Sequence, residues 1–132
     1  MATNPTHGRF QDILVGAKPE LRRICESLRG SITSLHKGRV EVVWPRQKIA
    51  SFGVGPRKMT DHYAYIAVLG AHVNLGFYHG ATLTDPSGLL EGTGRKLRHV
   101  RLRTGSAAKS GAVLALLRQA IADRKRQAAA RA

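Results

Sequence analysis

Polar side chains at alternate positions mark the residues that could do chemistry in this chain. Between His72 and Tyr78, the residues His72, Asn74 and Tyr78 share one parity and alternate with three apolar residues. This alternation predicts a β-strand with one polar face. Imidazole, amide and phenol groups together donate and accept hydrogen bonds, which suits a polar or anionic ligand.

A second strand-like run, residues 97–103, has a basic face. His99, Arg101 and Arg103 share one parity there. If the two strands are neighbours, their guanidinium, imidazole and amide groups would converge on one side of the sheet. The alternative is a solvated outer face that binds nothing. The apolar run over residues 63–69 predicts a central strand covered on both faces, so both interpretations stay open.

The glycine-rich segment EGTGRK, residues 91–96, lies between these two runs. Successive backbone N–H groups of a glycine turn, followed by two cations, can form a nest for an anion. A plain tight turn is the alternative, and the spacing G-x-x-x-x-G-K-[ST] of a phosphate-binding loop is absent. The predicted ligand-binding residues are therefore His72, Asn74, Tyr78, Gly92, Gly94, Arg95, Lys96, His99 and Arg101.

Metal binding and catalysis find less support in the sequence. None of the six histidines forms a pair at the i, i+4 spacing of a helical metal motif. A metal site would need the loop over residues 79–96 to fold back over the sheet. Its donors would then be His72, His79 and His99 with Asp85 or Glu91. The eight carboxylates are scattered and Cys25 lies on an apolar helix stripe, so we predict a protein that is not an enzyme.

The charge points to anionic partners. Twenty-two Lys and Arg residues against eight Asp and Glu give a formal net charge of +14, which attracts polyanions without sequence preference. Contacts would come from the loops at 45–48 and 56–58, the strand at 97–103 and the C-terminal helix. However, basic surfaces also serve solubility, aromatic residues make up only 5% of the chain, and no recognisable nucleic-acid motif such as stacked strand aromatics is present.

The compartment is predicted from what the sequence lacks. One cysteine excludes an internal disulfide. No run approaches the roughly 20 apolar residues that cross a bilayer, and the first ten residues carry no apolar signal segment. We therefore predict a cytoplasmic protein without a membrane partner.

The periodicity predicts the elements that would position these residues. Apolar residues from Leu21 to Leu35 recur at helical spacing, and a second helix follows Ser110. Strands are predicted at 40–44, 48–54, 63–69, 72–78 and 97–103. Strands grouped between helices indicate an α+β fold, with a mainly antiparallel sheet of about five strands flanked by N- and C-terminal helices. Residues 1–16 are predicted as a flexible or short helical segment, 17–126 as one domain and 127–132 as a frayed basic tail.

The phrases FGVGPRKMTDHYAYIAV and HVNLGFYHGATLTDPSGLLEGTGRKLRHVRLR resemble the YdhG-like family of small bacterial domains of unknown function. The resemblance implies an α/β sandwich with an antiparallel sheet between terminal helices. One family member is a frataxin-like iron chaperone, so iron is the cofactor that the resemblance implies. Ferrous iron is held by carboxylates and imidazoles, and the +14 charge disfavours such a site.

The leading prediction is thus a small domain that binds an anionic or polar small molecule on a sheet face lined by His, Asn and Arg. Iron handling and sequence-independent nucleic-acid binding are its alternatives.

Overall fold

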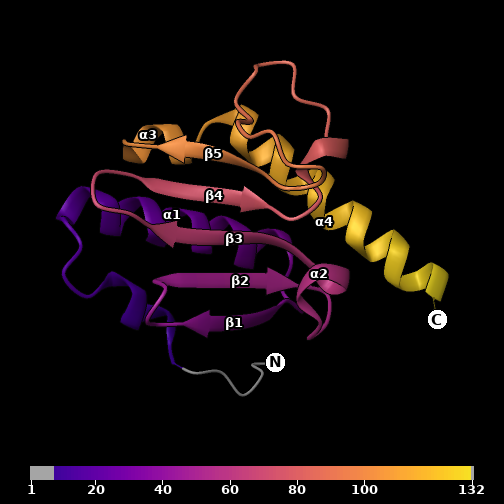
Figure 1. Ribbon diagram of the computed structural model, residues 1–132, viewed down its shortest axis with the longest axis horizontal. Helices are drawn as coiled ribbons and strands as arrows, with labels where there is room; N and C mark the ends of the chain where they lie inside the picture. Colours follow the sequence, from indigo (N-terminus) through magenta and orange to yellow (C-terminus); the bar gives the residue numbers. More distant parts are fainter. Residues whose placement is uncertain (1–7, 132) are drawn as a thin grey trace.

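The computed structural model describes residues 8–131 and contains one antiparallel sheet of five strands (Figure 1). The strands follow one another in space as they do in sequence, so that the third is central. They are β1 (Val40–Trp44), β2 (Ile49–Gly53), β3 (His62–Val68), β4 (Val73–Phe77) and β5 (Arg98–Leu102). The predicted sheet is confirmed.

Two long helices cover the same side of the sheet, α1 (Pro19–Leu35) and α4 (Gly111–Arg131), and both lie behind it in Figure 1. Apolar residues at helical spacing in α1 are buried against the strands, as the periodicity requires. This arrangement confirms the α+β fold. The described part of the chain also contains four short helical turns: η1 (Phe10–Leu14), α2 (Lys58–Asp61), η2 (Gly80–Thr82) and α3 (Gly105–Ala108). Within residues 8–131, no helix has the length and apolar character needed to span a membrane.

The core lies between the sheet and the two long helices. Its buried strand residues include Ala50, Phe52, Ala64, Ile66, Val73, Leu75, Phe77 and Val100. The turn η1 adds Phe10, Ile13 and Leu14 to this core. At the other end, α4 continues past the predicted domain boundary to Arg131, whose Nη2 donates to Oδ1 of Asp61 over 2.8 Å.

A β-bulge between β2 and β3 changes which residues face the core. Phe52 lies opposite Ala64, but Gly53 lies opposite His62, so Tyr63 has no partner across the strand pair. Tyr63 is buried in the core, and its hydroxyl lies 2.8 Å from Nδ1 of His36. Strict alternation along this run would place Tyr63 and Tyr65 on one face. The bulge separates them and leaves Tyr65 on the opposite side of the sheet.

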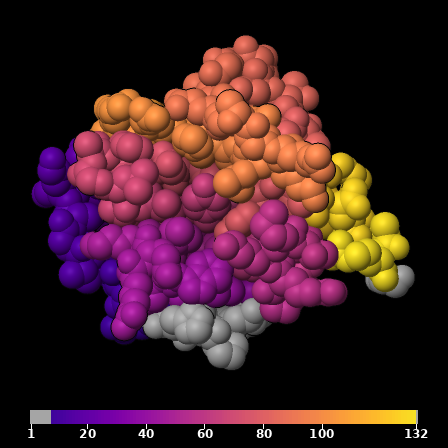
Figure 2. All heavy atoms as spheres, in the orientation of Figure 1, coloured from indigo at the N-terminus to yellow at the C-terminus, as the bar shows by residue number. Residues whose placement is uncertain are grey.

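Among residues 8–131, no helical layer comparable to α1 and α4 covers the outer face of the sheet. In Figure 2, the face turned to the viewer consists of the strands and their loops, while α1 and α4 show only at its edges. Most residues of β3 are buried on both faces, as expected for a covered central strand. However, aromatic side chains of the sheet, and not a second layer of helices, shield its outer face, and these side chains form the candidate site.

Candidate ligand-binding site

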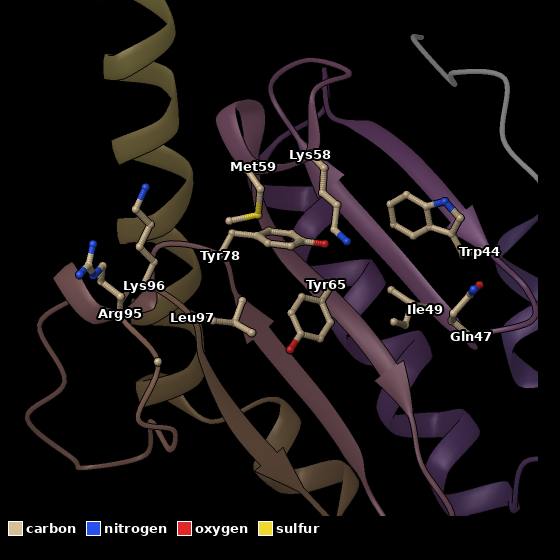
Figure 3. Close-up of a pocket in the computed structure, with 11 residues that line it drawn as sticks. Trp44, Gln47, Ile49, Lys58, Met59, Tyr65, Tyr78, Arg95, Lys96 and Leu97 are labelled. Atoms are coloured by element: carbon tan, nitrogen blue, oxygen red, sulfur yellow. The ribbon is translucent and has the colours of Figure 1, made fainter.

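A pocket with a volume of about 640 Å³ lies on the outer face of the sheet. Small-molecule sites commonly have volumes of roughly 300–1,000 Å³. Its lining combines sheet residues with residues of α2 and of the loop before β5 (Figure 3): Trp44, Gln47, Ile49, Lys58, Met59, Tyr65, Tyr78, Gly94, Arg95, Lys96 and Leu97. The pocket thus lies where the sheet, α2 and the loop before β5 meet.

The floor of the pocket is formed by two tyrosine rings. Tyr65 of β3 lies opposite Gly76 of β4, and a Cβ atom at position 76 would overlap the Tyr65 ring. Glycine at this position lets the aromatic ring pack directly on the neighbouring backbone. The rings of Tyr65 and Tyr78 are 5.3 Å apart between centroids and are tilted by 54°. Such a tilted pair is a favourable aromatic geometry.

A buried chain of hydrogen bonds holds Tyr78 from below. The Ser51 Oγ atom lies 2.9 Å from the Tyr78 hydroxyl and 2.5 Å from Nδ1 of His62. Ser51 has no exposed surface, so its hydroxyl cannot reach a molecule in the pocket. The Ser–His pair therefore positions the ring of Tyr78 and is not placed for nucleophilic attack.

Burial keeps this chain of hydrogen bonds uncharged. It lowers the pKa of His62 to about 4, although the nearby Asp61 carboxylate acts in the opposite direction. Burial also raises the pKa of Tyr78 to about 12, against the effect of its hydrogen bond with Ser51. At neutral pH, the pocket floor therefore presents a neutral phenol above a neutral imidazole.

The positive charge of the pocket comes from lysine and arginine. Lys58 Nζ lies 5.2 Å from the centroid of the Trp44 ring and 6.0 Å from that of Tyr78, within reach of cation–π attraction. Arg95 and Lys96 stand at the edge opposite Trp44 (Figure 3). None of the described lining residues is acidic. The pocket therefore offers aromatic surfaces under a net positive rim.

The pocket wall at α2 is fixed by contacts from distant parts of the chain. Nη1 of Arg124 donates to the carbonyl of Thr60 over 2.9 Å, and Arg131 pairs with Asp61. Nε2 of His79 lies 2.8 Å from the carbonyl of Met59. The C-terminal helix and the end of β4 thus hold the turn that presents Lys58 to the pocket.

The structure divides the predicted site residues into two groups on this face. Tyr78, Gly94, Arg95 and Lys96 line the pocket. Gly92 precedes that part of the loop and adopts a positive φ of 125°, a conformation that favours glycine.

The second group lies outside the pocket, on β4 and β5. Asn74 is opposite Arg101, and Gly76 is opposite His99, so the two polar strand faces do converge as predicted. Burial lowers the pKa of His72, with Arg101, Arg103 and His99 adding to the effect. Glu91 lies close by, with its Oε1 atom 3.3 Å from Nη2 of Arg101 and 3.8 Å from Nε2 of His99. A carboxylate therefore already offsets part of this positive charge.

Sequence reasoning did not find Trp44, Met59 or Tyr65 as site residues, and it placed Lys58 only in the basic loop at 56–58 that was predicted to contact nucleic acid. It also found no stacked strand aromatics, yet the register of β1 to β4 gathers three rings on one face. The glycine at position 76 is a signal that could have indicated the ring of Tyr65. A glycine inside a strand often marks the close approach of another group.

The metal site considered from the sequence is not formed in the described chain. Among residues 8–131, no three His, Cys, Asp or Glu side chains are grouped so that they could hold a metal ion. The His79 ring is engaged with the Met59 carbonyl instead of approaching His72 and His99. Cys25 is buried, and burial raises its pKa to about 12, as expected for an inert thiol.

Comparisons of the chain with models of known protein families, with curated proteins and with solved structures found no match. The resemblance to the YdhG-like family therefore stays a prediction. The geometry of the pocket carries the functional conclusion by itself.

Proposed function

We propose that this protein binds a small organic anion that carries a flat apolar or aromatic group, in the pocket on the outer face of the sheet. The observation that supports it best is the position of Lys58, whose ammonium lies near both the Trp44 and Tyr78 rings in a pocket lined by no described carboxylate. Aromatic surfaces bind flat groups, and an unpaired cation beside them binds an anion.

The open shape of the pocket sets the orientation of such a ligand. Its flat part would lie on the partly exposed ring of Tyr65, which packs against the buried ring of Tyr78, and its charged part would point to the rim. Lys58 would exchange its contact with the Trp44 ring for an ion pair with the ligand, and Arg95 and Lys96 would add positive charge from the facing loop.

Phenyl phosphate is a suitable probe, because it combines one ring with one anionic group. Trp44 is the only tryptophan of the chain, so its fluorescence reports on the pocket directly. We expect a saturable fluorescence change on titration with phenyl phosphate, and weaker binding of inorganic phosphate or of phenol. Lys58→Met should weaken phenyl phosphate binding about tenfold, the equivalent of roughly 1.4 kcal/mol.

A matched control removes the same charge elsewhere. Lys109 is exposed at the end of α3 and does not line this pocket, so Lys109→Met should leave the affinity unchanged. No saturable change in the native protein, or equal effects of the two variants, would contradict the proposal.

Iron handling, the alternative implied by the resemblance, lacks a group of donors in residues 8–131 and is not part of this proposal.

A further inference from the structure

The pocket is one end of a longer surface on the same face of the sheet. Tyr65 lies opposite Gly76, and Gly76 lies opposite His99 on β5. Because neighbouring strands are about 4.8 Å apart, the backbones of Tyr65 and His99 are separated by roughly 10 Å. The outer face of the sheet therefore extends from Trp44 on β1, across β3 and β4, to the basic edge at β5.

Positive charge is present at both ends of this surface. Lys58, Arg95 and Lys96 belong to the pocket, and Arg101 and Arg103 are exposed on and just after β5. The pairing of Arg101 with Glu91 joins two side chains that are 39% and 50% exposed. Exposed ion pairs contribute little free energy because water screens them, so a phosphate group can displace the carboxylate. A ligand with several anionic groups would therefore complement this surface better than one with a single charge.

The aromatic rings indicate which kind of polyanion fits. Trp44, Tyr65 and Tyr78 all contribute to one pocket on the outer face of an antiparallel sheet. Sheet-borne rings between cations are a common way to bind unpaired bases, since every base has a face that can stack. A duplex hides the faces of its bases within the stack, so it could use only the charges. The formal net charge of +14 adds long-range attraction for any nucleic acid.

We propose that the outer face of the sheet binds single-stranded nucleic acid. Bases stack on the partly exposed rings of Trp44 and Tyr65, while phosphates contact the cations at the two ends of the surface. These cations are Lys58, Arg95 and Lys96 at the pocket and Arg101 and Arg103 at β5. This inference rests on the proposed function, because the pocket would hold one nucleotide of the strand.

The test measures the binding of the full chain to labelled twelve-residue oligo(dT) and oligo(U) by fluorescence anisotropy, with a hairpin duplex of equal charge alongside. Thymidine monophosphate is titrated separately and followed by Trp44 fluorescence. We expect at least one oligomer to bind ten times or more tighter than the mononucleotide and clearly tighter than the duplex. With five cations engaged, the slope of log K against log salt should be about −3.5.

Two variants separate the ends of the surface. Tyr65→Ala should weaken binding of both the oligomer and the mononucleotide. The double variant Arg101→Gln/Arg103→Gln should weaken oligomer binding about tenfold and leave mononucleotide binding unchanged. Lys109→Gln/Arg118→Gln removes the same charge from exposed positions on the helices and should have little effect.

The possible failures are distinguishable. If the mononucleotide binds as tightly as the oligomers and the double Arg variant changes nothing, the inference is wrong and the small-ligand function stands. If the duplex binds as tightly as the single strands and Tyr65→Ala has no effect, binding is by charge alone and the inference is equally wrong. If phenyl phosphate, the mononucleotide and the oligomers all fail to bind, both proposals fall.

Discussion

The two faces of this sheet are made by the same five strands but have opposite properties. The face toward α1 and α4 is filled by buried apolar side chains such as Phe52, Ile66 and Phe77. The outer face carries aromatic and polar residues around a pocket of about 640 Å³. Because strand side chains alternate, a substitution acts mainly on the face to which it belongs. We therefore expect the helix side to dominate stability and the outer side to carry the proposed binding, with Ser51 and His62 as a buried polar layer under the pocket.

The largest expected effect is on the helix face. Phe77→Ala removes a ring without exposed surface and should lower the free energy of unfolding by about 3–5 kcal/mol. Urea unfolding followed by circular dichroism measures this loss. Lys58→Met, on the outer face, should change stability by no more than about 0.5 kcal/mol. Similar losses of stability in the two variants would contradict the inference that the helix side dominates the stability of the protein.

Lowering the pH should destabilise the protein through His62, which lies beneath the outer face of the sheet. Its pKa is about 4 in the folded protein, against 6.5 for the free side chain, so the unfolded chain takes up this proton first as the pH falls. The stabilising contribution of neutral His62 is complete above pH 6.5 and is lost on acidification toward pH 4. Its size is on the order of 3 kcal/mol.

Urea unfolding at pH 7 and at pH 4.5 tests this contribution. His62→Gln should be less stable at pH 7 and should show a smaller further loss at acid pH. An unchanged pH dependence in the variant would show that other groups carry the acid sensitivity.

Gly76→Ala should affect both stability and binding, because it adds a Cβ atom to β4 directly under the Tyr65 ring. The added Cβ must displace this ring, and we expect a loss of about 1–3 kcal/mol together with weaker phenyl phosphate binding. Gly30→Ala, in α1, is the matched control. Nothing lies near its Cβ position, so it should stabilise the helix by up to about 1 kcal/mol. A neutral Gly76→Ala would mean that Tyr65 is free to move, and the pocket floor would then not be preformed.

The smallest expected effect concerns the ion pair between Arg131 and Asp61, which we call the tether of α2. Arg131→Ala removes the pairing with Asp61 and should reduce stability by about 1 kcal/mol or less, since the arginine is 40% exposed. Because α2 carries Lys58, affinity for phenyl phosphate should also fall slightly. Arg126→Ala, which removes a more exposed contact with Asp123 that does not involve α2, should leave the affinity unchanged. The same affinity in both variants would show that the tether does not position Lys58.

Much of the fold could be predicted from sequence, because strand alternation and helical apolar stripes are local patterns. The run at 40–44 forms β1 as predicted, and the parity of β4 correctly placed Val73, Leu75 and Phe77 toward the core. The turns α2 and α3 were not predicted, because four residues are too few to show a helical period. Of the site, Tyr78 and the cations of the loop before β5 were identified, whereas the other two rings were not.

The sequence by itself determined where the strands and long helices lie, which side of β4 is polar and how strongly the protein attracts anions. Only the tertiary structure decided that a bulge turns Tyr63 inward and leaves Tyr65 outward, and that Trp44, Tyr65 and Tyr78 share one pocket. The physical reason is that periodicity is set by neighbours along the chain. Strand register, and the positions of α2 and of the loop at 94–97, depend instead on contacts between residues far apart in sequence.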